Sequence, residues 1–123
     1  SNYTSFFKPM LHQIMDMTNT NKILKARCDM TTNKGIEKVH DTHVDFVDQT
    51  SYKSVIFYVN ETDGDTTLFN ERYTSDFKDR TQTIMKKVEP KENRLLVFEG
   101  DLLHTGSSPI NYSNRILINC NFI

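Results

Sequence analysis

The feature that most constrains the fold is a series of short segments rich in β-branched and aromatic residues, each bounded by turn residues. The clearest of them is Ser54-Val55-Ile56-Phe57-Tyr58-Val59-Asn60, whose composition is typical of a buried strand. We predict further strands at 22–30, 37–46, 66–69, 83–88, 94–98 and 115–122. Many short strands after one leading helix indicate a mainly β (α+β) chain, arranged as a β-sandwich or a barrel-like jelly roll.

Before the first strand, apolar residues recur at the spacing of a helix. They are Phe7, Met10, Leu11, Ile14 and Met15. A helical lead-in over about 5–17 is therefore expected, followed by a β-core over about 22–123. Residues 73–82 form a polar stretch that predicts a loop. With 123 residues and no shift in composition, the sequence predicts a single domain spanning 1–123.

Charge and cysteine usage exclude several classes of function. The net charge is -1, and no basic run is interleaved with aromatic residues, which argues against nucleic acid as a partner. Cys28 and Cys120 have no paired spacing, so a disulfide framework or a cysteine-based zinc site is not expected. No apolar run has the length of a membrane span. We expect a protein of the reducing cytoplasm without a membrane partner.

The first chemically informative motif is His43-Val44-Asp45. In a strand, residues i and i+2 project from one face, so an imidazole and a carboxylate would enter the same pocket. Two imidazoles and one carboxylate can hold Fe(II) and leave coordination positions open. A chain with four His and ten Asp contains a His-x-Asp by chance about one time in three, so a surface His bonded to an Asp is the alternative.

The last predicted strand carries a second signal. Its alternation places Ile116, Ile118, Cys120 and Phe122 on one face, and Arg115, Leu117, Asn119 and Asn121 on the other. Polar side chains on a buried face need partners. A dicarboxylate ligand would supply one for Arg115, because a guanidinium meets a carboxylate in a two-pronged hydrogen bond.

The order of these residues resembles a known family. His43 and Asp45 are followed by a distal His, His104, and then by Arg115 at the start of a late strand. This order is similar to that of the 2-oxoglutarate/Fe(II)-dependent dioxygenases, and most of all to their prolyl 4-hydroxylase-like branch. The resemblance covers about 37–122 and includes three further segments: 55–60, 64–69 and the run from Val88-Glu89-Pro90 to 93–98. The chain departs from the family pattern at Asp65 and Asn93, where Gly is usual, and in its short N-terminal helical region.

The resemblance implies a fold, a metal and a reaction. The fold would be a double-stranded β-helix, the jelly-roll core that cupins share. His43, Asp45 and His104 would be the catalytic residues and the iron ligands. The cosubstrates would be 2-oxoglutarate and O2, with ascorbate as a further cofactor. The products would be succinate, CO2 and a substrate hydroxylated at an aliphatic carbon, with a prolyl residue of a peptide or protein as the first candidate and a small molecule as the second.

The resemblance also assigns the cosubstrate pocket. Arg115 would pair with the distal carboxylate of 2-oxoglutarate, and Tyr58 matches a strand Tyr that helps to hold it. Thr67 and Asn119 would line the same pocket. For Tyr58 a core aromatic remains the alternative, and for Thr67 and Asn119 a hydroxyl or amide satisfied within the sheet.

Other residues and functions stay open. On a strand His40 would face away from His43, so we expect it to lie behind the ligands or on the surface, while His12 is an ordinary polar residue of the helix. Loops at 48–53 and 73–81 are the expected sites of substrate choice. A non-oxidative, cupin-like metal-binding β-barrel, either an isomerase or a binding module, is the alternative function. A purely structural barrel that has lost its metal site is a third.

Overall fold

The computed structural model describes residues 8–49 and 51–123, so the part of the predicted helix before residue 8 lies outside the described residues. Helix α1 (Lys8–Thr18) leads into seven strands: β1 (Ile23–Thr32), β2 (Lys53–Tyr58), β3 (Thr66–Arg72), β4 (Ile84–Val88), β5 (Leu95–Glu99), β6 (Leu102–Gly106) and β7 (Asn114–Phe122). A short 3-10 turn, η2 (Phe77–Asp79), interrupts the long loop between β3 and β4. This is the mainly β fold that the sequence predicts.

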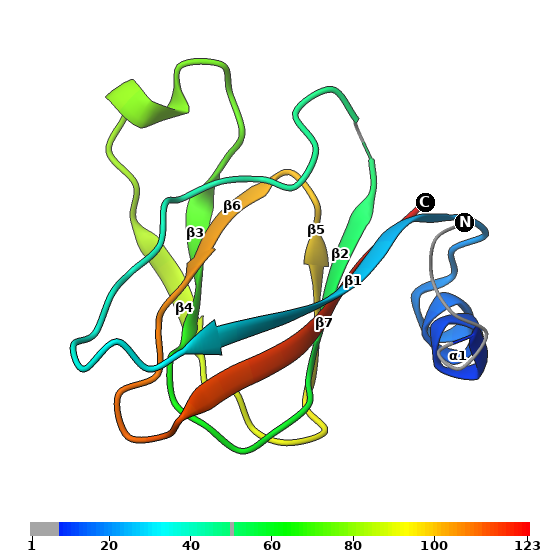
Figure 1. Ribbon diagram of the computed structural model, residues 1–123. Helices are drawn as coiled ribbons and strands as arrows, with labels where there is room; N and C mark the ends of the chain where they lie inside the picture. Colours follow the sequence, from blue (N-terminus) through cyan, green and yellow to red (C-terminus); the bar gives the residue numbers. More distant parts are fainter. Residues whose placement is uncertain (1–7, 50) are drawn as a thin grey trace.

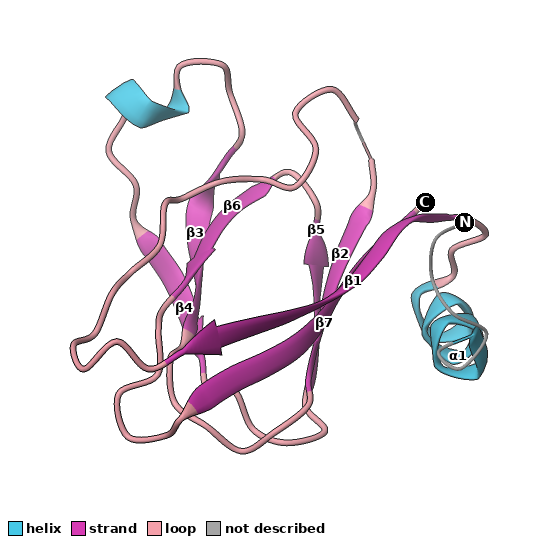
Figure 2. Cartoon of the chain, viewed as in Figure 1, coloured by secondary structure: helices cyan, strands magenta, loops and turns pink. Residues whose placement is uncertain are grey.

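The strands form two antiparallel sheets. One has the order β1-β7-β2-β5 and the other the order β4-β3-β6. The sheets face each other as the two layers of a jelly-roll core, and α1 lies beside the four-stranded sheet (Figure 1). Figure 2 shows that loops make up much of the rest of the chain, above all between β1 and β2 and between β3 and β4.

The core has two parts that share the central strands. Between the two sheets lie Ile56, Tyr58, Leu68, Val88, Phe98, Leu102 and Leu117. Behind the four-stranded sheet, α1 packs Leu11 and Ile14 against Val55, Ile118, Cys120 and Phe122. Successive residues of β7 thus face the helix and the other sheet in turn, as the sequence alternation predicts.

The predicted strand at 37–46 is wrong. This segment pairs with β6 and the turn after it only at two isolated bridges, Val39 with Ser107 and His43 with His104. A continuous ladder needs consecutive paired residues, and here the chain runs across the sheet edge and touches it twice. Val39 is 60% exposed and does not face the core, whereas Val44 is buried.

Strand β6 is the element that the sequence analysis missed, and it carries His104. Leu102 and Leu103 are both buried although they are neighbours in the strand. A strand buried on both faces shows no alternation of polar and apolar residues, so its pattern cannot be distinguished from that of a turn followed by a short apolar pair.

No described helix is long and apolar enough to cross a membrane.

The packing of α1 can be tested at Leu11, whose side chain is fully buried. Leu11→Ala should lower the free energy of unfolding by about 2–5 kcal/mol, because it removes buried methyl groups and leaves a cavity between the helix and the sheet. Urea denaturation followed by circular dichroism measures this change.

Met17→Ala is the matched control on the same helix, since the Met17 side chain is 67% exposed. Its effect should stay within about 0.5 kcal/mol. Equal losses in the two variants would contradict the packing described for α1.

Candidate metal centre and adjoining pocket

A backbone bridge brings the two candidate histidine ligands together. The amide of His43 donates to the carbonyl of His104 at 3.0 Å, and the amide of His104 donates to the carbonyl of His43 at 3.1 Å. Residues paired in this way project their side chains from the same side of the sheet. The two imidazole rings accordingly lie side by side, with their centroids 4.5 Å apart.

The orientation of each ring is fixed by a carbonyl two residues earlier. His43 Nδ1 lies 3.0 Å from the carbonyl of Asp41, and His104 Nδ1 lies 3.1 Å from the carbonyl of Leu102. A carbonyl only accepts hydrogen bonds, so Nδ1 is the donor in each ring and Nε2 is the atom left for a metal. Both Nε2 atoms face Asp45 Oδ1, at 3.6 Å from His43 and 3.7 Å from His104. The three ligand atoms lie within 4.8 Å of one another, as a single metal ion requires.

The carboxylate of Asp45 is held from behind. Its Oδ2 accepts hydrogen bonds from the Asn121 amide at 2.8 Å and from the Ser54 hydroxyl at 3.4 Å, and Asn121 also donates to Ser54 at 3.0 Å. These contacts leave Oδ1 to face the two imidazoles. Partners behind a ligand orient it toward the metal and tune its affinity.

The charge state of Asp45 suits a cation. Burial acts to raise the pKa of this carboxyl, but His104, His43 and Asn121 together hold it well below its ordinary range. In return, Asp45 raises the pKa of His43, against the opposing effect of burial. The carboxyl is therefore ionised at neutral pH and can act as an anionic ligand.

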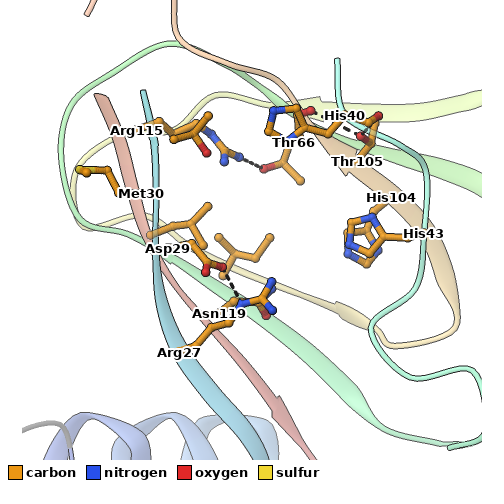
Figure 3. Close-up of a pocket in the computed structure, with 14 residues that line it drawn as sticks. Arg27, Asp29, Met30, His40, His43, Thr66, His104, Thr105, Arg115 and Asn119 are labelled. Carbon is orange, nitrogen blue, oxygen red and sulfur yellow. Dashed lines mark hydrogen bonds and ion pairs between the residues drawn. The ribbon is translucent and has the colours of Figure 1, made fainter. Parts of the chain in front are cut away.

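A cavity of about 310 Å³ opens beside these residues. This volume is of the size that encloses a small organic ligand. Its lining comes from β1, β2, β3, β6, β7 and the segment before β2 (Figure 3): Arg27, Asp29, Met30, Thr31, His40, His43, Ile56, Thr66, His104, Thr105, Gly106, Arg115, Leu117 and Asn119.

Arg115 places a buried positive charge in this pocket. Its side chain is 5% exposed, and it donates to the carbonyl of Gly64 at 2.7 Å and to Thr66 Oγ1 at 2.9 Å. Burial lowers the pKa of Arg115, and among the described residues no carboxylate forms an ion pair with it. A buried guanidinium without an acidic partner is costly, so this end of the pocket favours an anionic guest.

Two glycines make room for the guanidinium. A Cβ at Gly106 would lie 3.3 Å from Arg115 Nη2, and a Cβ at Gly64 would lie 2.5 Å from the carbonyl oxygen of Ser107. Gly64 also has a φ of +95°, which side chains rarely adopt. Gly106 was not predicted as a site residue, because its role depends on a contact between distant strands.

Thr66 is the second residue that the sequence analysis missed. Its Oγ1 accepts hydrogen bonds from Arg115 and, at 2.6 Å, from the hydroxyl of Tyr58. Both acceptor positions of the oxygen are then used. The hydroxyl can still donate a hydrogen bond to a ligand. Tyr58 itself is fully buried and lies behind Thr66, with its ring 5.9 Å from the guanidinium carbon, so it adjoins the pocket without lining it.

Two expectations about the lining need correction. Thr66 and not Thr67 lines the pocket, because successive residues of β3 point to opposite faces. His40 does not face away from His43, since both line the pocket. Their segment is not a regular strand, so the alternation of period two does not apply to it.

Asn119 lies in the pocket as expected, beside Leu117 on the inner face of β7. Its Oδ1 is the one buried side-chain oxygen or nitrogen among the described residues that lacks a hydrogen-bond partner. A buried acceptor without a donor costs free energy, so a donor group of a bound ligand or water would stabilise this position.

Comparison with known proteins agrees with the fold. No family model and no curated protein sequence matches the chain. Solved structures that are similar to it include the following two. The prolyl-4-hydroxylase of Pseudomonas putida has a TM-score of 0.58 at 15% identity, with 94% of this chain and 62% of that chain covered. HygX from Streptomyces hygroscopicus, with iron bound, has a TM-score of 0.56 at 14% identity, with 92% and 63% covered.

At these identities the likeness establishes a shared fold and no more. The chain spans less than two thirds of the length of either structure. HygX was solved with iron bound, and this chain brings His43, Asp45 and His104 together in a cluster that can hold a metal ion.

The hydrogen bond from Asn121 to Asp45 can be tested by metal titration. Asn121→Ala should weaken the binding of Mn(II), used as a stand-in for Fe(II), by about 10- to 100-fold, because the carboxylate loses the partner that orients it. Isothermal titration calorimetry measures this change.

Asn119→Ala is the control two residues away on the same strand face, since it is Asn121 and not Asn119 that hydrogen-bonds Asp45, and it should leave Mn(II) affinity unchanged. An unaltered affinity in Asn121→Ala would show that Asp45 needs no support from β7.

Proposed function

We propose that this chain is an Fe(II)- and 2-oxoglutarate-dependent dioxygenase that hydroxylates an aliphatic carbon. The observation that carries the proposal is one pocket with two different ends. At one end His43, Asp45 and His104 present three ligand atoms, and at the other the buried Arg115 forms no ion pair with any carboxylate of the described residues. 2-Oxoglutarate has the matching asymmetry, with a 2-keto acid that can chelate a metal and a distal carboxylate that can meet a guanidinium.

Six residues at the site have a defined task in this proposal. His43 Nε2, His104 Nε2 and Asp45 Oδ1 hold the metal and leave coordination positions for the keto acid and for O2. Arg115 binds the distal carboxylate. The hydroxyl group of Thr66 donates a second hydrogen bond to the same carboxylate. Tyr58 holds Thr66 in place from behind. Bound Fe(II) would supply the activation of O2, coupled to the conversion of 2-oxoglutarate to succinate and CO2.

The nature of the substrate is the less constrained part of the proposal. The likeness to a prolyl-4-hydroxylase supports a prolyl residue of a peptide or protein as the first candidate, and a small molecule is the second. On the inner face of β1, Arg27 Nε bonds Asp29 Oδ2 at 2.8 Å, and both side chains are about half exposed at the pocket. This polar wall suits a substrate that carries hydrogen-bonding groups, such as a peptide backbone.

A non-oxidative metal-binding barrel would share the metal ligands but would have no use for the buried charge of Arg115. It would bind a divalent cation without consuming 2-oxoglutarate. Succinate formation therefore separates the two functions.

The test is succinate production by protein incubated with Fe(II), ascorbate, 2-oxoglutarate and air. We expect slow turnover without a primary substrate and none in His43→Ala, which removes a ligand. Arg115→Ala should raise the KM for 2-oxoglutarate by about 30-fold or more, the equivalent of a loss of about 2 kcal/mol for one partner of a buried charge pair.

His12→Ala is the control, since His12 is an exposed residue of α1 outside the pocket, and its rate should match that of the original protein. If 2-oxoglutarate neither binds nor is consumed by the metal-loaded protein, the dioxygenase proposal fails.

A further inference from the structure

His40 is a titratable residue of the pocket that the proposed function does not yet use. It lies three residues before His43, but its ring is not part of the metal cluster. Within the part of the chain that the structure describes, its side-chain hydrogen bond is that of Nε2 with the hydroxyl of Ser108 at 3.4 Å, which is long for a hydrogen bond. The imidazole is therefore available to a ligand.

The backbone of His40 is fixed next to the anion-binding end of the pocket. Its amide donates to the carbonyl of Gly106 at 2.9 Å, and its carbonyl accepts a hydrogen bond from the hydroxyl of Thr105. Gly106 is also the residue against which the guanidinium of Arg115 lies. In Figure 3, His40, Thr66 and Arg115 lie at one end of the pocket, apart from the neighbouring rings of His43 and His104.

The charges around His40 explain its state before a ligand binds. Burial lowers its pKa first, and the positive charges of Arg115 on β7 and of Lys38 lower it further. Within the same segment, Asp41 raises the pKa of His40, and His43 lowers it, as Arg115 does. The side chains that adjoin it from β3 and β6, Thr66 and Thr105, do not titrate in this range. The ring is accordingly neutral at neutral pH.

We propose that His40 is a second binding residue for the distal carboxylate of 2-oxoglutarate, beside Arg115, and that it takes up a proton when this carboxylate enters. The inference rests on the proposed function, since it needs a carboxylate at Arg115. The entering charge neutralises the guanidinium that opposes protonation of His40, and it offers the imidazolium an acceptor. The complex therefore holds more protons than the free protein, so 2-oxoglutarate binds more tightly as the pH falls.

The experiment is calorimetric titration of the Mn(II)-loaded protein with 2-oxoglutarate, in buffers with different enthalpies of ionisation. Between about pH 6 and about pH 8.5 both carboxyl groups of the ligand stay ionised, so proton uptake reports on the protein. We expect net uptake of up to one proton for each ligand bound. The dissociation constant should rise with pH, by at most about tenfold for each pH unit.

His40→Gln is the decisive variant, because it keeps a polar side chain but cannot titrate. It should abolish the proton uptake, flatten the pH profile and weaken binding at about pH 6 by about 5- to 10-fold, as expected for the loss of one charge-assisted hydrogen bond at a partly exposed position. Mn(II) affinity, measured separately, should not change. His12→Gln on the exposed face of α1 is the matched control and should behave as the original protein.

Two results would overturn the inference, and only the second would also overturn the dioxygenase proposal. Binding of 2-oxoglutarate without proton uptake, or equal uptake in His40→Gln, removes the role of His40 and leaves the dioxygenase proposal standing. Failure of 2-oxoglutarate to bind the Mn(II)-loaded protein at any pH removes both.

Discussion

The site depends on one pair of backbone hydrogen bonds, those that His43 and His104 exchange. They join an irregular segment to strand β6 at a single bridge, and they fix two imidazoles on the same side of the sheet. The carbonyls of Asp41 and Leu102 then turn both rings so that Nε2 faces Asp45. A candidate metal centre thereby lies where the segment before β2 has almost no regular secondary structure. Strand β6 carries one candidate ligand, and the bridge holds the segment before β2 to it.

Strand β7 connects this centre to the rest of the molecule. Its outer face, with Ile118, Cys120 and Phe122, packs against α1 and anchors the four-stranded sheet. Its inner face carries Asn121 behind the candidate metal ligand Asp45, and at the far end Arg115 in the pocket. The same alternation that stabilises the core therefore sets the spacing between the candidate metal ligands and the buried guanidinium. Among the described residues the buried guanidinium of Arg115 has no carboxylate within ion-pair distance, and it donates instead to the carbonyl of Gly64 and the hydroxyl of Thr66.

The sequence supported the fold class, the central strands and the face of β7 on which Arg115 lies, because these follow from residue type and period. It was less reliable where contacts between distant segments decide the structure. The stretch 37–46 resembled a strand, yet it meets β6 only at two bridges. Strand β6 was missed, since Leu102 and Leu103 are buried on both faces and show no alternation. The segment that carries His40 and His43 is not a regular strand. The side of the pocket on which His40 lies could therefore not be derived from its spacing to His43 in the sequence.

By itself, then, the sequence determined which groups could form a site: the imidazoles of His43 and His104, the carboxylate of Asp45 and the guanidinium of Arg115. Only the tertiary structure decided how they meet. It placed Thr66 instead of Thr67 beside Arg115, brought His40 to the anion-binding end, and used Gly106 to admit the guanidinium. The physical reason is that local period and propensity act over a few residues. The pairing of strands far apart in the chain depends on packing and backbone hydrogen bonds, which no single segment encodes.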